Sequence, residues 1–404
     1  MIMGPSKSTE QQQPFELSLE RARESKLHLV VAKSFGSFPA LIEVLTKYGP
    51  QFGTINLRAG SANVIEKAID ALLQHGASGS LSELSLLVNN KSPLRLDPSS
   101  GDHGINPHGS PLNASFTAML GSLSVFRLGG TNVYWDNMKF SSRLVELHIE
   151  GVVLGYDIDI VPFLQAISSA SELRDLKIIS LMTIRNPQDT NTFSPITFPN
   201  LQSLFLGGLY YNTLEILLRT IVSCTHRVTL VLGSRSLRVQ RGEINIRMVA
   251  PDGPQPYRFL EHIPVDTLTI VGYEWFNEHI HDLLETLPAL KTLHIDSCTF
   301  HQNNCSRLGR PSNAQDVSFA ALETLLITGS LINIGTIDEF KKVVASHPLG
   351  QFVYGITVAH DPIGYCQGEP LEDDSGLVGW LRANIPVVRV VDHEPSDYRK
   401  WRLW

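Results

Sequence analysis

The apolar residues of this chain follow a spaced pattern that recurs along most of its length. In "LPALKTLHIDSCTF" (287–300) the pattern is Leu290-x-x-Leu293-x-Ile295-x-x-Cys298. Matches to Leu-x-x-Leu-x-(Leu/Ile) begin at Leu81, Leu144, Leu173, Leu201, Leu290 and Leu322. Random placement of the leucines would give only about one such match. The chain is therefore built from repeats.

Relaxed versions of the same skeleton predict further copies. Admitting Ile, Val or Phe adds Phe52/Ile55/Leu57, Leu123/Phe126/Leu128 and Val265/Leu268/Ile270. Weaker matches are Val353/Ile356/Val358 and Ile385/Val388/Val390, and "RVTLVLG" predicts a strand around Leu230. About twelve units are expected between Phe52 and Val390.

Each unit predicts a short strand followed by a helix. Alternation places Leu293 and Ile295 on one face of a strand, and the residues between them on the other face. After the strand, apolar residues recur at helical spacing in "DIDIVPFLQAISSA" (157–170), "YYNTLEILLRTIVSC" (210–224) and "TIDEFKKVVASHP" (336–348). The chain is therefore predicted to be an α/β protein with parallel strands.

Two α/β architectures fit repeated strand–helix units. One is a doubly wound sheet or barrel, and the other is a solenoid of leucine-rich-repeat type. The strands carry a three-point pattern rather than the continuous apolar runs of buried parallel strands. The units outnumber the eight of a barrel, and no glycine-rich phosphate loop follows a strand. We therefore predict a leucine-rich-repeat solenoid, a curved stack with a parallel sheet on its concave face.

Two units carry the fuller consensus of the leucine-rich-repeat family, which the sequence resembles. The asparagine form is Leu81-x-x-Leu84-x-Leu86-x-x-Asn89, and the cysteine form ends at Cys298. In this family the asparagine or cysteine is expected to bond the backbone of the turn that leaves the strand. The segments "FPNLQSLFLGGL" (198–209) and "LPALKTLHIDSC" look like the C-terminal region of F-box/leucine-rich-repeat proteins of mushroom-forming fungi.

The opening "FELSLERARESKLHLVV" (15–31) is similar to the segment that joins F-box to repeats in those proteins. The resemblance implies substrate recognition for a cullin-type ubiquitin ligase. No "Leu-Pro-x-Glu" F-box start precedes Phe15, so contact with the cullin adaptor is expected only if an F-box is missing from this gene model. The alternatives are a ubiquitin-independent repeat scaffold and, more remotely, an α/β enzyme.

Length and composition are those of a folded protein. The chain has 404 residues, of which 43% are hydrophobic and 18% charged. We expect a disordered tail at 1–14, one repeat domain at 15–404, and a cap near 385–404. A net charge of −7 provides no basic field for nucleic acid or an anionic membrane. No signal peptide or membrane span is predicted, so a cytoplasmic or nuclear monomer is expected.

Candidate chemical motifs are sparse. The cysteines are Cys224, Cys298, Cys305 and Cys366, without a C-x-x-C pair. His279 and His281, two residues apart on a predicted helix, point in different directions and suit a solvated face. Asp157 and Asp159 fall at a helix start and are predicted caps. We predict no catalytic residue, metal site or cofactor, and therefore no enzyme.

The concave face is the predicted binding site, because strand residues between the buried ones line it. The candidates are Glu83, Arg127, Glu146, His148, Glu150, Asp175, Lys177, Phe205, Thr292, His294, Asp296 and Leu326. They mix both charges with apolar side chains, as protein-binding surfaces do. A protein partner of unknown identity is expected there.

Overall fold

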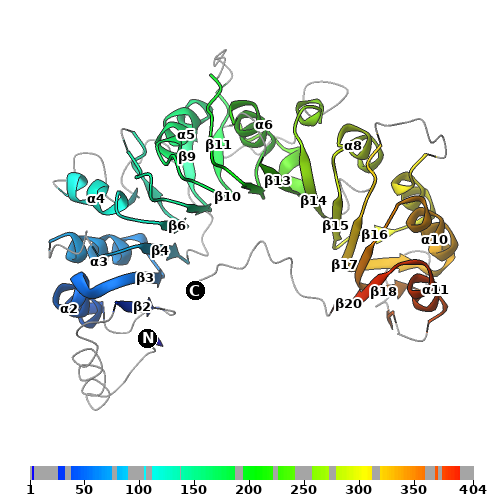
Figure 1. Cartoon of the computed structure of the whole chain (residues 1–404), viewed down its shortest axis with the longest axis horizontal. Coiled ribbons are helices and arrows are strands. Elements are labelled where there is room, and N and C mark those ends of the chain that lie inside the picture. The colour runs from blue at the N-terminus through cyan, green and yellow to red at the C-terminus, as the bar shows by residue number, and fades with distance from the viewer. Residues whose placement is uncertain are drawn as a thin grey trace.

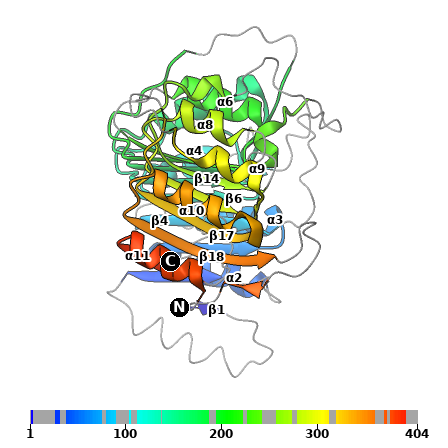
Figure 2. The ribbon, with the colours of Figure 1, turned by 90° about the vertical axis from the view of Figure 1, so that its right-hand side faces the viewer.

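The computed structural model describes residues 2–3, 26–31, 38–74, 80–89, 104–105, 112–136, 138–186, 194–221, 226–241, 257–272, 279–311, 319–359, 369–371 and 375–391. Figure 1 shows an arc in which the strands line the inner side and the helices cover the outer side. Figure 2 shows α8 (Ile280–Thr286), α10 (Ile337–Ser346) and α11 (Gly376–Asn384) following one another along that outer side. We call the inner side of the sheet the concave face.

One large sheet runs through the described part of the chain. Its sixteen strands are β1 (Ile2–Met3), β2 (Leu27–Val31), β3 (Phe52–Ala59), β4 (Glu83–Val88), β6 (Val125–Gly129), β8 (Glu146–Glu150), β10 (Asp175–Ile179), β12 (Ser203–Gly207), β13 (Arg227–Leu232), β14 (Val265–Val271), β15 (Thr292–Asp296), β16 (Thr299–Phe300), β17 (Thr324–Asn333), β18 (Gln351–Ala359), β19 (Glu369–Pro370) and β20 (Val387–Val390). Along its main path the strands follow sequence order, and thirteen form a parallel array without closing into a barrel. Over these residues the doubly wound and barrel alternatives are therefore wrong.

Helices and smaller elements connect the strands. The remaining helices are α2 (Phe38–Tyr48), α3 (Ala62–Gln74), α4 (Asn113–Leu120), α5 (Ile160–Ser168), α6 (Tyr211–Thr220) and α9 (Gln302–Cys305). The 3-10 turns are η2 (Gly49–Gln51), η4 (Asp157–Asp159), η5 (Ser234–Leu237), η6 (Arg258–Leu260), η7 (Ser306–Leu308) and η8 (Ile334–Thr336). Two small sheets pair β9 (Val153–Tyr156) with β11 (Met182–Ile184), and β5 (Gly104–Ile105) with β7 (Asn132–Val133). The helices predicted within 157–170, 210–224 and 336–348 are confirmed as α5, α6 and α10.

The leucine skeleton fills the interior between sheet and helices. Leu147, Leu176 and Leu204 are register partners on β8, β10 and β12, and each is at most 1% exposed. The leucines three positions earlier, such as Leu144 and Leu173, are equally buried. Burying a leucine contributes about 1.5–3 kcal/mol, so the aligned columns of apolar side chains hold successive units together.

A left-handed residue recurs in the turn that leaves the strand, two positions after the last skeleton residue of the strand. Gly130 has φ 68° and Gly208 has φ 64°, and the others at this position are Gly151, Ser180, Gly272, Ser297 and Gly329. A Cβ at Gly130 would lie 2.2 Å from the Val88 carbonyl oxygen. The hydrophobic pattern along the chain did not indicate this position.

The residue after the left-handed one occupies the asparagine or cysteine position of the consensus. It is Asn89 in one unit and Cys298 in another. The Cys298 thiol donates to the Gly272 carbonyl of the preceding unit at 3.2 Å, so the predicted turn-bonding role of Cys298 is confirmed. Asn89, at the same position of its unit, is exposed. The two forms of the consensus therefore differ in how deeply this side chain is packed.

The weak skeleton predicted at Val353/Ile356/Val358 is wrong, because other residues of this strand point into the interior. Phe352 and Tyr354 pair with Leu325 and Ile327 and are at most 1% exposed. The interior pattern of this unit is Leu349-x-x-Phe352-x-Tyr354. Our search omitted tyrosine, which fills the third position here.

The register of the skeleton shifts by two residues at β13. Leu206, the last skeleton residue of β12, pairs with Leu230, and Leu230 pairs with Leu268, the middle skeleton residue of β14. The pairing of β13 with β14 also contains a one-residue bulge at Asp266. We call this feature the register shift.

The two ends of the sheet fall at the predicted terminal segments. Ile2 and Met3, assigned by the sequence analysis to a disordered tail, form β1 beside Val30 and Val31. At the other end β20 pairs with β18. The rest of the 1–14 tail and residues 392–404 of the predicted cap lie outside the described residues.

Candidate functional site

The predicted site residues lie on the concave face in rows that cross the strands. The first row contains Glu83, Glu146 and Asp175; the middle row contains Arg127, His148, Lys177, Phe205 and Thr292; the third contains Glu150, His294 and Leu326. Asp296 lies beyond the third row. Most of these side chains are partly exposed, Asp175 is the most open of them, and His148 and Asp296 are each 5% exposed. Alternation in the strands therefore placed the candidates on the predicted face.

The part of the face on β4, β6, β8, β10 and β12 carries most of the charged side chains, and we call it the charged half. At its centre Arg127 Nε donates to Glu146 Oε1 at 2.7 Å, and Arg127 Nη1 donates to Ser85 Oγ at 3.3 Å. These bonds connect β4, β6 and β8. The ion pair orients the arginine, whose side chain is only 13% exposed.

His148 lies between two cations in the middle row. Its register neighbours are Arg127 and Lys177, and its Nε2 lies 3.4 Å from Glu150 Oε2. Burial lowers the pKa of His148, and Lys177 and Arg127 lower it further, against the opposing effect of Glu150. The imidazole is therefore neutral at neutral pH.

Asp175 and Glu146 are register partners in the first row. Burial raises the pKa of Asp175, the Glu146 carboxylate raises it further, and Arg174 opposes them. Like charges directly opposite each other on adjacent strands are unfavourable. Arg127 already pairs with Glu146, so a further cation from a partner would act mainly on Asp175.

An aromatic side chain borders the charged half. Lys177 Nζ lies 4.9 Å from the centre of the Phe205 ring, which is a favourable cation–π arrangement. Phe205 is partly exposed and so offers apolar area next to charge. Leu326 is also partly exposed, but it lies on β17, several strands away.

The part of the face on β14, β15 and β17 is dominated by threonines, and we call it the threonine half. Thr267, Thr292 and Thr324 continue the middle row on successive strands. Thr328 Oγ1 donates to Asp296 Oδ1 at 2.8 Å and lies 2.7 Å from His294 Nε2. Since the hydroxyl proton goes to Asp296, His294 Nε2 is the donor to Thr328. Burial lowers the pKa of His294, and Asp296 opposes this.

A buried polar cluster near β11 was not predicted. Asp157 Oδ1 accepts from Thr183 Oγ1 at 2.6 Å and from Asn212 Nδ2 at 2.7 Å. Asn212 Oδ1 in turn accepts from the Gln240 N–H at 3.1 Å. Of the two predicted caps, Asp159 accepts from the Tyr156 N–H at 2.6 Å, as a cap does. Asp157 instead links successive units. Because its partners are distant in the sequence, no local motif predicted these hydrogen bonds.

The buried thiols are unsuited to nucleophilic chemistry. Burial raises the pKa of Cys298 and of Cys305 to about 12, and the thiolate is the reactive form. Among the described residues, no group of three or more His, Cys, Asp and Glu side chains is arranged to hold a metal ion. His281 instead lies beside the Arg307 carbonyl and Glu285.

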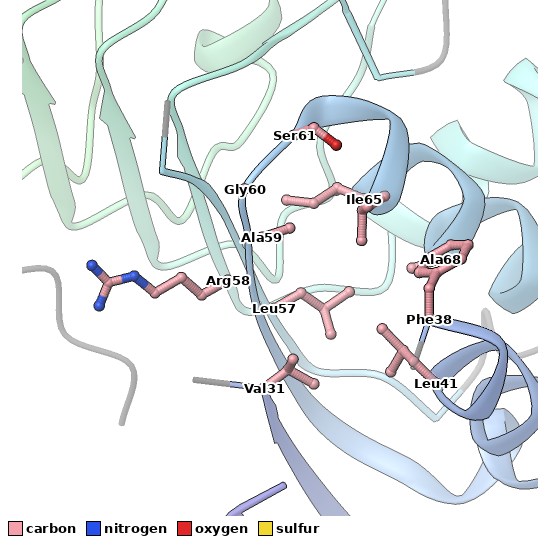
Figure 3. Close-up of a pocket in the computed structure, with 11 residues that line it drawn as sticks. Val31, Phe38, Leu41, Leu57, Arg58, Ala59, Gly60, Ser61, Ile65 and Ala68 are labelled. Atoms are coloured by element: carbon pink, nitrogen blue, oxygen red, sulfur yellow. The ribbon is translucent and has the colours of Figure 1, made fainter. Parts of the chain in front are cut away.

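One pocket lies apart from the concave rows. It has a volume of about 180 Å³ and lies between the ends of β2 and β3 and the starts of α2 and α3. Figure 3 shows apolar side chains converging on it, while the Arg58 side chain points away. The sequence analysis did not identify this pocket.

Comparisons with known proteins give no family assignment for this chain. No protein-family model and no curated protein matches the chain. Within the residues described, none of the helices has the length and apolar character needed to cross a membrane.

Proposed function

We propose that the chain is a leucine-rich-repeat protein that binds a protein partner through its concave face. The repeated skeleton, the parallel strands in sequence order and the recurring left-handed turn support membership in this class. The observation that carries the binding function is the charged half with Phe205. These residues place charge and aromatic area together on the inner side of the sheet, where the helices do not lie.

The charged half has the features expected of the specificity-determining part of an interface. Interfaces are enriched in aromatic residues and arginine, and complementary charge sets orientation and association rate. Asp175 and Glu146 favour a basic group on the partner, while Phe205 provides an apolar contact beside it. The threonine half has its central polar groups bonded to one another, so it contributes shape more than charge.

The resemblance to fungal F-box/leucine-rich-repeat proteins extends the proposal to substrate recognition for a cullin-type ligase. It rests on the repeat style and on the segment 15–31. Purification of the product of a gene model extended upstream should recover the cullin and its adaptor together with the partner. An extended product that carries an F-box and recovers the partner without the cullin would favour a ubiquitin-independent scaffold.

The test of the concave face uses two variants and a matched control. Partners co-purifying with the wild-type chain are quantified for Asp175→Lys, for Phe205→Ala, and for Lys342→Glu on the outer helix α10. Lys342 is 74% exposed and pairs with Glu339. We expect each concave variant to reduce recovery at least about tenfold, corresponding to about 1.4 kcal/mol, and the control to retain it.

Circular dichroism and thermal unfolding must show that all three variants remain folded. Binding that survives both concave substitutions and is lost with Lys342→Glu would place the interface on the helical side. It would refute the proposed use of the concave face.

A further inference from the structure

The pocket between α2 and α3 is lined by apolar side chains from four elements. Val31 lies on β2, Leu57 on β3, Phe38 and Leu41 on α2, and Ile65 and Ala68 on α3. Their side chains point toward one another in Figure 3. Leu57, Ile65 and Ala68 are at most 2% exposed, so the body of the pocket lies beneath the surface.

One repeat position that lines the pocket lacks a side chain. Ala59 pairs with Val88, so Gly60 occupies the turn position that Val152, Leu181, Leu209 and Cys298 occupy in later units. Those four side chains are at most 2% exposed and pack into the interior. A Cβ built on Gly60 meets no atom within 4 Å. Gly60 is exposed, as is Asn89 at the same position of the next unit, so Gly60 lies where the pocket meets the surface.

The backbone does not require glycine at this position. The φ angle of Gly60 lies outside the left-handed region, unlike those of Gly130 and Gly208. A residue with a side chain could adopt this conformation without strain.

Size and lining define the chemistry that fits. A cavity of roughly 150 Å³ with an aliphatic and aromatic lining stays dry and binds benzene, so about 180 Å³ suits a single ring or a small fused pair. Arg58 points away from the space (Figure 3), which leaves Ser61 as the polar side chain at its edge. A charged ligand would lose its hydration without compensation.

We propose that this pocket binds a neutral, apolar small molecule of benzene to indole size. The site is separate from the concave rows, and the inference does not depend on the proposed protein-binding function. A free small molecule fits better than a partner's side chain, because the lining lies beneath the surface.

Binding is tested by adding benzene, indole and benzoate to the full chain with methyl-labelled isoleucine and leucine. Benzene and indole should each shift the Ile65 and Leu57 methyl resonances saturably. Benzoate, which has the same ring with a charge, should bind at least about tenfold more weakly. Equal binding of benzoate would overturn the requirement for a neutral ligand. Absence of any saturable shift at those methyls with benzene and indole would overturn the site.

Filling the space provides the second arm. Gly60→Leu should raise the midpoint of thermal unfolding without ligand, and should reduce benzene and indole affinity at least about tenfold. Gly379→Leu is the matched control, since Gly379 on α11 is also exposed and a Cβ there also meets no atom within 4 Å, but the residue does not line the pocket. Ala68→Leu fills the pocket from the opposite wall should Gly60→Leu not fold. Wild-type affinity in a folded filled variant would refute the proposal.

Discussion

The charged half and the threonine half of the concave face are built on the same strand skeleton but use their polar groups differently. In the charged half, the Arg127–Glu146 pair lies beside Asp175, whose nearest register partner is another carboxylate. In the threonine half, His294, Thr328 and Asp296 form one chain of hydrogen bonds. Shared architecture therefore does not imply shared function.

The two halves differ in which side chains can still form favourable contacts with a partner. A side chain whose hydrogen bonds are already made gains little from a new contact, whereas repelling carboxylates gain from a cation. The charged half should therefore set specificity, and the threonine half should act mainly as structure. The tests below compare the two halves by their contribution to stability.

The largest expected effect compares the turns that leave β6 and β14. Both Gly130 and Gly272 have positive φ, but a Cβ at Gly130 would lie 2.2 Å from the Val88 carbonyl, whereas one at Gly272 meets nothing within 4 Å. Gly272→Ala should cost about 1–2 kcal/mol of left-handed strain. Gly130→Ala should cost more than about 3 kcal/mol, because the backbone must also move. Urea unfolding of both variants measures the difference, and equal losses would show that the clash is relieved without cost.

An intermediate effect is expected from Thr328→Val in the threonine half. The substitution keeps the shape but removes the hydroxyl that donates to buried Asp296 and accepts from His294. We expect a loss of about 2 kcal/mol in the free energy of unfolding, from leaving a buried carboxylate without this donor. Thr324→Val on the same strand is the control and should change stability by less than about 0.5 kcal/mol. Similar losses from both variants would argue against a special role for the hydrogen-bond chain.

The smallest expected effect is a pH dependence that separates His148 from His294. Both histidines have a folded-state pKa below the unfolded value of about 6.5. The unfolded state therefore binds more protons, and stability falls as pH decreases through about 6.5 toward the folded pKa values. Arg127 and Lys177 add to the shift at His148, although Glu150 opposes it, while Asp296 opposes the shift at His294.

Replacing His148 with Gln should therefore flatten the pH dependence more than replacing His294 with Gln. Urea unfolding at pH 7.5 and pH 5.5 checks this for both variants. A larger flattening from His294→Gln would mean that the cations in the charged half act on His148 less than their positions indicate.

The sequence predicted most main-sheet strands from β3 onward, where leucine, isoleucine, valine or phenylalanine occupies the interior positions. It misplaced the skeleton in β18 because Tyr354 fills an interior position there, with its ring buried. It also missed the register shift, since the local spacing of Val265, Leu268 and Ile270 in β14 follows the usual skeleton. Only pairing with the previous strand shows the change.

The candidate face was predictable from alternation, but its chemistry was not. Alternation indicates that His148 and Asp296 point toward the concave side, yet both are buried by neighbours on adjacent strands. The Gly60 pocket is visible only when units are aligned through the sheet, because a glycine after a strand is typical of any turn. Contacts between units, rather than patterns within them, decide these features.

The register shift places the turns on the two sides of β13 at different levels along the strand direction. When β12 and β14 are compared through their register with β13, the left-handed turn after β14 lies two residues farther along than the turn after β12. Two residues correspond to about 6.6 Å along the strand direction. The rim of the arc therefore has a step at β13. A partner that contacts the rim on both sides of β13 would therefore have to follow this step, whereas the rows of the concave face continue in register across β13.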